Sequence, residues 1–151
     1  GSILNHMGFP VVQSIECAGK RDQERIADWV IRQGDKVTHL AVNGQMRGAS
    51  LRQNLADIAD IEALSGRAMN WVFFGPCSAQ QFAEVFKTVQ PSRATFVTGT
   101  VFQKLGAKED LFGQKQASTN VNDRLQLLVA QLQSEYEAGL KGQAIRRGGR
   151  R

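Results

Sequence analysis

The sequence contains only two cysteines, Cys17 and Cys77, in 151 residues. Neither belongs to a C-x-x-C pair, so composition argues against a disulfide framework, a thioredoxin-like redox pair and a cysteine-rich zinc site. Histidine is equally scarce. His6 falls in residues 1–7, which are typical of a tag remnant, and this leaves His39 for the rest of the chain. We therefore expect no bound metal and no cofactor.

The sequence also lacks a long apolar run. A helix that crosses a bilayer needs roughly 18 to 20 consecutive apolar residues, and no segment approaches that length. No secretory leader follows the tag-like residues. Few cysteines, no leader and no apolar span together predict a cytoplasmic protein that does not associate with membranes.

The net positive charge is small outside the end of the chain. The formal net charge is +5, and four arginines lie within residues 143–151, so 5 − 4 leaves +1 for everything else. These arginines are Arg146, Arg147, Arg150 and Arg151. The pattern predicts a flexible Arg/Gly-rich tail that can bind nucleic acid or an acidic partner. No aromatic residue interrupts it, so it would supply attraction without base-specific recognition.

The common catalytic patterns are incomplete. Lys20 is followed by Arg21, and not by the Ser or Thr of a phosphate-binding loop, and no G-x-G-x-x-G follows the first expected strand. His39 precedes the expected strand end at Asn43 by four residues. At roughly 3.3 Å per residue it lies over 10 Å from that end, which argues against a Ser-His or Cys-His hydrolase. We therefore favour a non-catalytic protein.

What the sequence does contain is a regular alternation of strand and helix patterns. Apolar runs predict strands at residues 9–18, 36–44, 68–75 and 93–105. Helical spacing predicts helices at residues 22–34, 51–64, 78–89 and 121–140. This order predicts an α/β three-layer sandwich with a mainly parallel four-stranded sheet and helices on both faces, of flavodoxin, Rossmann or thioredoxin type. We expect one domain over residues 8–142.

Capping residues and helix stripes refine these elements. Asp22, Ser50 and Ser78 are each placed to cap a helix start, and Gly34 is placed to end the first helix. The second helix carries an apolar stripe typical of a core-facing surface, formed by Leu51, Leu55, Ile58, Ile61 and Leu64. Its acidic residues are expected on the solvent side, with weak surface pairs to Arg52 and Arg67; they are Asp57, Asp60 and Glu62.

A parallel sheet also predicts where a ligand would bind. Ligands of such sheets lie beyond the carboxyl ends of the strands. This topology gathers a predicted ligand rim of Cys17, Lys20, Asn43, Arg47, Ser50, Cys77 and Ser78. Within it, Cys77 is the single catalytic candidate, because a thiol at a helix start lies at the positive end of the helix dipole. The other interpretation of Cys77 is a small residue packed in a tight turn.

These observations favour a non-catalytic regulatory or protein-interaction α/β domain, such as a domain of a larger protein or assembly. We expect a protein partner or self-association. Two alternatives stay open. The first is a nucleic-acid-associated protein that uses the arginine tail. The second is a small-ligand sensor or enzyme with its site at the strand rim near Cys77.

Overall fold

The computed structural model describes residues 13–43 and 48–148, which belong to two compact units. The first unit comprises Gly1–Phe74 and Thr88–Phe96. The second comprises Gly75–Lys87 and Val97–Arg151. The single domain that we expected over residues 8–142 stays a prediction.

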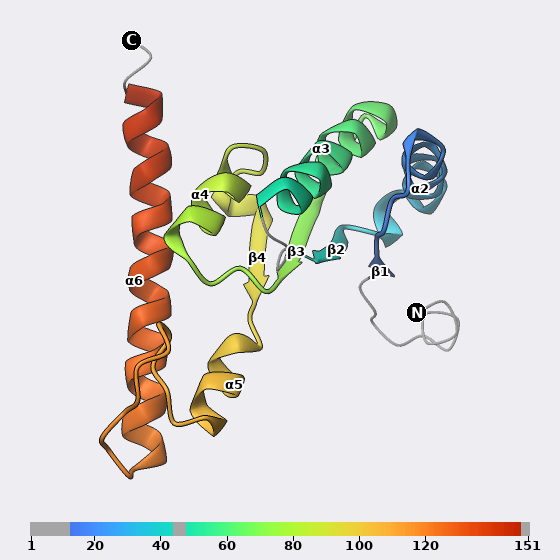
Figure 1. Ribbon diagram of the computed structural model, residues 1–151. Helices are drawn as coiled ribbons and strands as arrows, with labels where there is room; N and C mark the ends of the chain where they lie inside the picture. The colour runs from blue at the N-terminus through green and yellow to red at the C-terminus, as the bar shows by residue number, and fades with distance from the viewer. Residues whose placement is uncertain (1–12, 44–47, 149–151) are drawn as a thin grey trace. The chain divides into compact units, whose positions relative to one another are not determined.

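The first unit is built on a parallel sheet (Figure 1). The strands of the chain are β1 (Gln13–Ser14), β2 (His39–Asn43), β3 (Asn70–Phe74) and β4 (Ala94–Val97). Their order in the sheet is β1-β2-β3-β4, and the β1–β2 and β2–β3 pairs are parallel. The α/β class and a parallel sheet of three strands are therefore confirmed.

Two helices connect these strands, and they pack against each other. They are α2 (Lys20–Gln33), followed by the 3-10 turn η1 (Gly34–Lys36), and α3 (Gly48–Ser65). Each links neighbouring parallel strands, and such crossovers are right-handed, so both helices belong on the same face of the sheet. Gly34 ends α2 as expected, with a φ of 55° that a residue with a side chain rarely adopts.

The core of the first unit lies between α3 and one face of the sheet. Leu40 pairs in register with Trp71, and Val42 with Phe73, so the four side chains share that face. Trp71 donates from Nε1 to Glu62 on α3, which identifies this face as the one that α3 covers. All four residues are at most 3% exposed.

The second unit is helical. It contains α4 (Ala79–Phe86), α5 (Thr100–Gly106) and α6 (Val121–Gly148), while the 3-10 turn η2 (Pro91–Arg93) belongs to the first unit. Both α4 and α5 pack on α6. Tyr136 of α6 meets Phe82 and Phe86 of α4 edge to face, with ring centroids 5.4 and 5.7 Å apart. Nearer the start of α6, Leu128 is fully buried in a cluster with Val101 and Leu111.

Three predicted elements differ from the structure. Within the described residues, the strand expected over residues 9–18 comprises only Gln13–Ser14. The strand expected over residues 93–105 ends at Val97, and a helix, α5, follows Gly99. The reason is packing: Val101 and Leu105 are four residues apart, and both meet the cluster around Leu128, which requires helical spacing. The last helix was expected to end near residue 140, but α6 continues to Gly148 and includes most of the predicted tail. Glycines weaken a helix without breaking it, and no proline interrupts this stretch.

Candidate functional site

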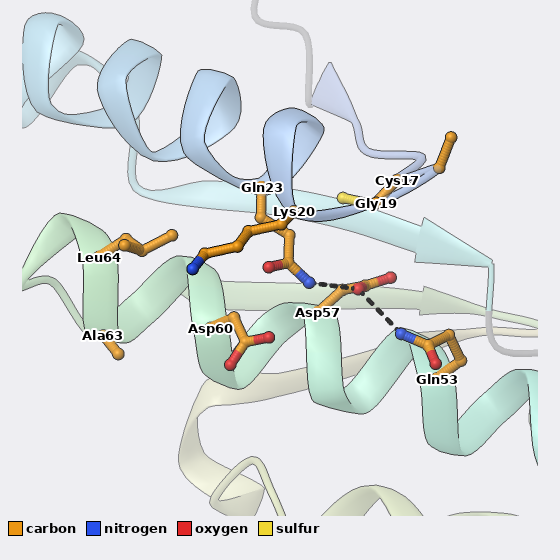
Figure 2. Close-up of a pocket in the computed structure, with 10 residues that line it drawn as sticks. Cys17, Gly19, Lys20, Gln23, Gln53, Asp57, Asp60, Ala63 and Leu64 are labelled. Carbon is orange, nitrogen blue, oxygen red and sulfur yellow. Dashed lines mark hydrogen bonds between the residues drawn. The ribbon is translucent and has the colours of Figure 1, made fainter.

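A cavity of about 690 Å³ opens in the first unit between the β1–α2 loop and α3 (Figure 2). This volume lies in the range of small-molecule pockets, roughly 300 to 1,000 Å³. Its polar lining residues are Cys17, Lys20 and Gln23 from the loop and α2, and Gln53, Asp57 and Asp60 from α3. The cavity therefore lies between two consecutive helices, α2 and α3, and both contribute side chains to its wall.

Asp57 is the most buried polar residue of this cavity, with 4% of its surface exposed. Its Oδ1 accepts hydrogen bonds from Gln23 Nε2 at 2.7 Å and Gln53 Nε2 at 3.2 Å. Figure 2 shows the two amides converging on that oxygen while Oδ2 points away from both. Within the described part of the chain, no residue donates to Oδ2. The amides thus hold the carboxylate in place and leave one oxygen available.

The solvent-facing position predicted for Asp57 is wrong. Ile58 and Ile61 of α3 are fully buried, but α3 also packs on α2, and the hydrogen bond from Gln23 places Asp57 on that second contact. An apolar stripe identifies only the surface that faces the sheet. Gln23, which is 7% exposed, was not singled out from the sequence for the same reason. No sequence signal distinguishes these two polar residues from exposed ones.

Lys20 and Asp60 bring further charge to the cavity. Both residues are exposed and line the cavity, and Figure 2 shows the Lys20 side chain extending along it towards Asp60 and Leu64. Among the described residues, Lys20 has no salt-bridge partner within 4.0 Å. The cavity therefore presents one free ammonium group and the two carboxylates of Asp57 and Asp60.

The loop before α2 is held by Asp22. We expected Asp22 to cap the helix from outside, but α2 begins at Lys20 and Asp22 lies in its first turn. Its Oδ2 accepts a hydrogen bond from Ala18 N at 2.8 Å, and Arg25 pairs with its other oxygen. The hydrogen bond from Ala18, with that from Arg25, lowers the pKa of Asp22. The carboxylate is therefore charged at neutral pH and keeps both hydrogen bonds.

Cys17 lies in the wall of the cavity and is half-buried. Burial raises the pKa of its thiol to about 11, and the negative charges of Asp57 and Asp22 add to the effect. The thiol is therefore protonated at neutral pH, which disfavours a role as nucleophile because the thiolate is the reactive species.

This raised pKa makes Cys17 a slow target for alkylation. In a Cys77→Ser background at pH 8, we expect iodoacetamide to modify Cys17 on the order of 100-fold more slowly than in the urea-unfolded chain. The rate should keep rising about tenfold per pH unit up to pH 10. Rates measured by mass spectrometry across pH 7 to 10 test this. An inflection near pH 8.5 in the folded protein would contradict it, because steric shielding alone does not move the inflection.

The structure brings part of the predicted rim to this cavity. Cys17 and Lys20 line it, and Asn43 is the last residue of β2. Ser50 lies inside the first turn of α3 and does not cap it, because α3 begins at Gly48, and it is not a lining residue. Arg47 lies outside the described residues.

Cys77 and Ser78 belong to the second unit. Ser78 caps α4 as expected: its Oγ accepts from Gln81 N, and Gln81 Oε1 accepts from Ser78 N in return. Cys77 donates its own backbone N–H to Gln81 Oε1 at 2.9 Å. Its side chain is partly buried against the cluster of Val101, Leu111 and Leu128. This packing favours the interpretation of Cys77 as a small residue in a tight turn.

The predicted tail divides between α6 and the end of the chain. Arg146 and Arg147 fall in the last turn of α6. Arg150 and Arg151 lie outside the described residues. The binding role assigned to these four arginines stays a prediction.

Neither the described side chains nor the comparisons with known proteins identify a function. Within residues 13–43 and 48–148, no group of three or more histidine, cysteine, aspartate or glutamate side chains is arranged to hold a metal ion. In that same part of the chain, no helix has the length and apolar character to cross a membrane. No protein-family model, curated protein or solved structure matches the chain.

Proposed function

We propose that this chain is a non-catalytic protein-interaction domain that binds a partner protein through exposed aromatic residues of the second unit. The observation that carries the proposal is the exposure of two phenylalanines, Phe102 on α5 at 72% and Phe112 in the turn that follows α5 at 63%. They are the most exposed large apolar side chains among the described residues, and contiguous apolar surface left in water marks sites that become buried on binding.

The turn that presents Phe112 is held rigidly. Asp110 Oδ1 accepts from Phe112 N at 2.9 Å and from Gln114 N at 2.8 Å. Gln131 of α6 donates to Asp110 Oδ2 and accepts from Leu111 N at 2.8 Å. The Gln114 hydrogen bond, with the others, lowers the pKa of Asp110, so the carboxylate stays charged. A preorganised aromatic loses little freedom on binding, which supports a role as a binding anchor.

The proposal predicts that a Phe102→Ala, Phe112→Ala double variant loses partner binding. We expect at least about tenfold weaker capture of the partner protein, the size typical of aromatic anchors. Ile31→Ala is the matched control, because Ile31 is 51% exposed on α2 of the first unit. Quantitative pull-down from the source lysate measures retention. Light scattering on a sizing column determines whether the partner is a second copy of this chain.

Either a specific partner protein or a self-associated species, lost in the double variant and kept in the control, supports the proposal. A monomer that retains the same proteins with and without the two phenylalanines overturns it. Circular dichroism of each variant shows whether lost binding reflects lost folding. Both substituted side chains are mostly in water, so their removal should leave the thermal midpoint nearly unchanged.

The other predictions from the sequence remain alternatives. The four tail arginines are the main source of the net positive charge, which keeps a nucleic-acid role open. A ligand or catalytic site at the rim near Cys77 has less support, because the cavity described above lies in the first unit. A fourth parallel strand and helices on both sheet faces also stay proposals. Because α2 and α3 share one face, a third layer must come from another part of the chain.

A further inference from the structure

We propose that the first-unit cavity binds a small zwitterion, a molecule in which a short apolar chain joins an ammonium group to an acidic group. The ammonium group would meet Asp57, and the acidic group would meet Lys20. This inference concerns a different unit and a different class of ligand from the protein partner proposed above, so either can fail without the other.

The incomplete pairing of Asp57 is the first argument. Asp57 has only 4% of its surface exposed, so its carboxylate meets solvent only through the cavity that it lines, and a buried charge is costly unless paired or fully hydrogen-bonded. Neutral amides from Gln23 and Gln53 satisfy Oδ1. Oδ2 receives no donor from the described residues and belongs to a side chain that lines a cavity of about 690 Å³. An ammonium group would supply both the missing donor and the missing countercharge.

Lys20 supplies the second argument, because it gives the cavity a positive charge beside the negative charge of Asp57. A ligand with only a positive charge would be attracted by Asp57 and Asp60 but repelled by the Lys20 ammonium, which has no ion-pair partner in the described part of the chain. A ligand that also carries an acidic group turns that repulsion into attraction. Ala63 and Leu64 line the cavity beyond Asp60, at the end towards which Lys20 extends, and offer apolar surface there to a short carbon chain (Figure 2).

The identity of the cation follows from the other side chains. The Cys17 thiol stays neutral, so it adds no third anionic ligand to Asp57 and Asp60. The described residues also contain no cluster of three metal-ligating side chains. Hard divalent cations take six or more oxygen ligands, which two carboxylates do not provide. An organic ammonium group, with three hydrogen-bond donors, fits the available acceptors better.

Three probes of matched size separate the charges: 4-aminobutyrate carries both, n-butylammonium only the positive one and butyrate only the negative one. Each is titrated to 50 mM into the full chain, with amide chemical shifts followed by NMR. We expect saturable shifts at Lys20, Gln23 and Asp57 with 4-aminobutyrate, and at least fivefold weaker binding of the other two. Absence of shifts with all three probes overturns the proposal, as does equal binding of all three.

Two variants assign the charges. Asp57→Asn keeps the shape of the side chain and should weaken 4-aminobutyrate binding about tenfold to a hundredfold. Asp28→Asn, at an exposed position of α2 outside the cavity, should bind as the parent does. Lys20→Met should abolish the preference for 4-aminobutyrate over n-butylammonium. Because Lys20 is exposed, Lys20→Met should fold even if Asp57→Asn does not, and its ligand preference can still be measured. Unchanged binding in Asp57→Asn, or an unchanged preference in Lys20→Met, overturns the proposal.

Discussion

Replacing Gly139 with alanine should destabilise the second unit by about 1 to 3 kcal/mol, although alanine is the better helix former. Gly139 is buried in α6 where the helix crosses α4. A Cβ atom at this position would lie 2.6 Å from Phe82 Cβ and 3.1 Å from the carbonyl oxygen of Ala79. Neither atom is the free end of a flexible chain, so the two helices must separate. Urea unfolding followed by circular dichroism measures the loss.

Gly142 provides the matched control on the same helix. A Cβ atom there would meet only Ala83 Cβ at 3.9 Å, an ordinary van der Waals contact. Gly142→Ala should therefore stabilise the protein by up to about 1 kcal/mol through helix propensity alone. Opposite signs for the two substitutions identify close helix contact as the cause. A stabilising effect at both positions would show that α4 and α6 do not approach closely at Gly139.

Removing the carboxylate of Glu62 should cost the first unit about 2 to 4 kcal/mol. Glu62 Oε2 accepts from Met69 N at 2.8 Å, Trp71 Nε1 at 3.1 Å and Arg93 Nη1 at 2.5 Å. In Glu62→Ala, the indole N–H of the fully buried Trp71 and the partly buried guanidinium of Arg93 lose that acceptor. Tryptophan fluorescence during urea unfolding, to which both Trp29 and Trp71 contribute, reports the change in the free energy of unfolding.

The control for this loss is Glu84→Ala. Glu84 pairs with Lys87 at 2.8 Å, and the Lys87 side chain is 43% exposed. Such a surface pair contributes less than about 1 kcal/mol. A similar small loss at Glu62 would mean that water replaces the carboxylate without penalty, and that the three hydrogen bonds do not join α3, β3 and η2 energetically.

Glu62 also shows why partner choice was not predictable. From the sequence, the expected partner was Arg67, five residues away on the same segment. In the structure Arg67 donates to the backbone carbonyls of Val30, Gly34 and Val37, at the end of α2 and beyond it. The carboxylate of Glu62 instead meets Arg93, which lies 31 positions farther along the chain. Sequence spacing predicts pairs within one helix, whereas these pairs depend on which strands are neighbours.

The candidate site was likewise predictable from the sequence only in part. Topology alone predicted that residues after the first strand would border a site, and Cys17 and Lys20 do line the cavity. The carboxylate that makes this cavity chemically distinctive, Asp57, was placed on the opposite side of its helix. Its position depends on the packing of α2 against α3, which no periodicity within either helix encodes.

The sequence by itself determined the alternation of strands and helices, the α/β class and several element ends, such as Gly34 after α2 and Ser78 before α4. These features follow from local periodicity, backbone freedom and capping, which act within a few residues. Only the tertiary structure decided that residues 100–106 are helical, that Asp57 is buried and that Gly139 has no room for a side chain. Each of these depends on contacts between segments distant in the sequence, whose energies outweigh local preference.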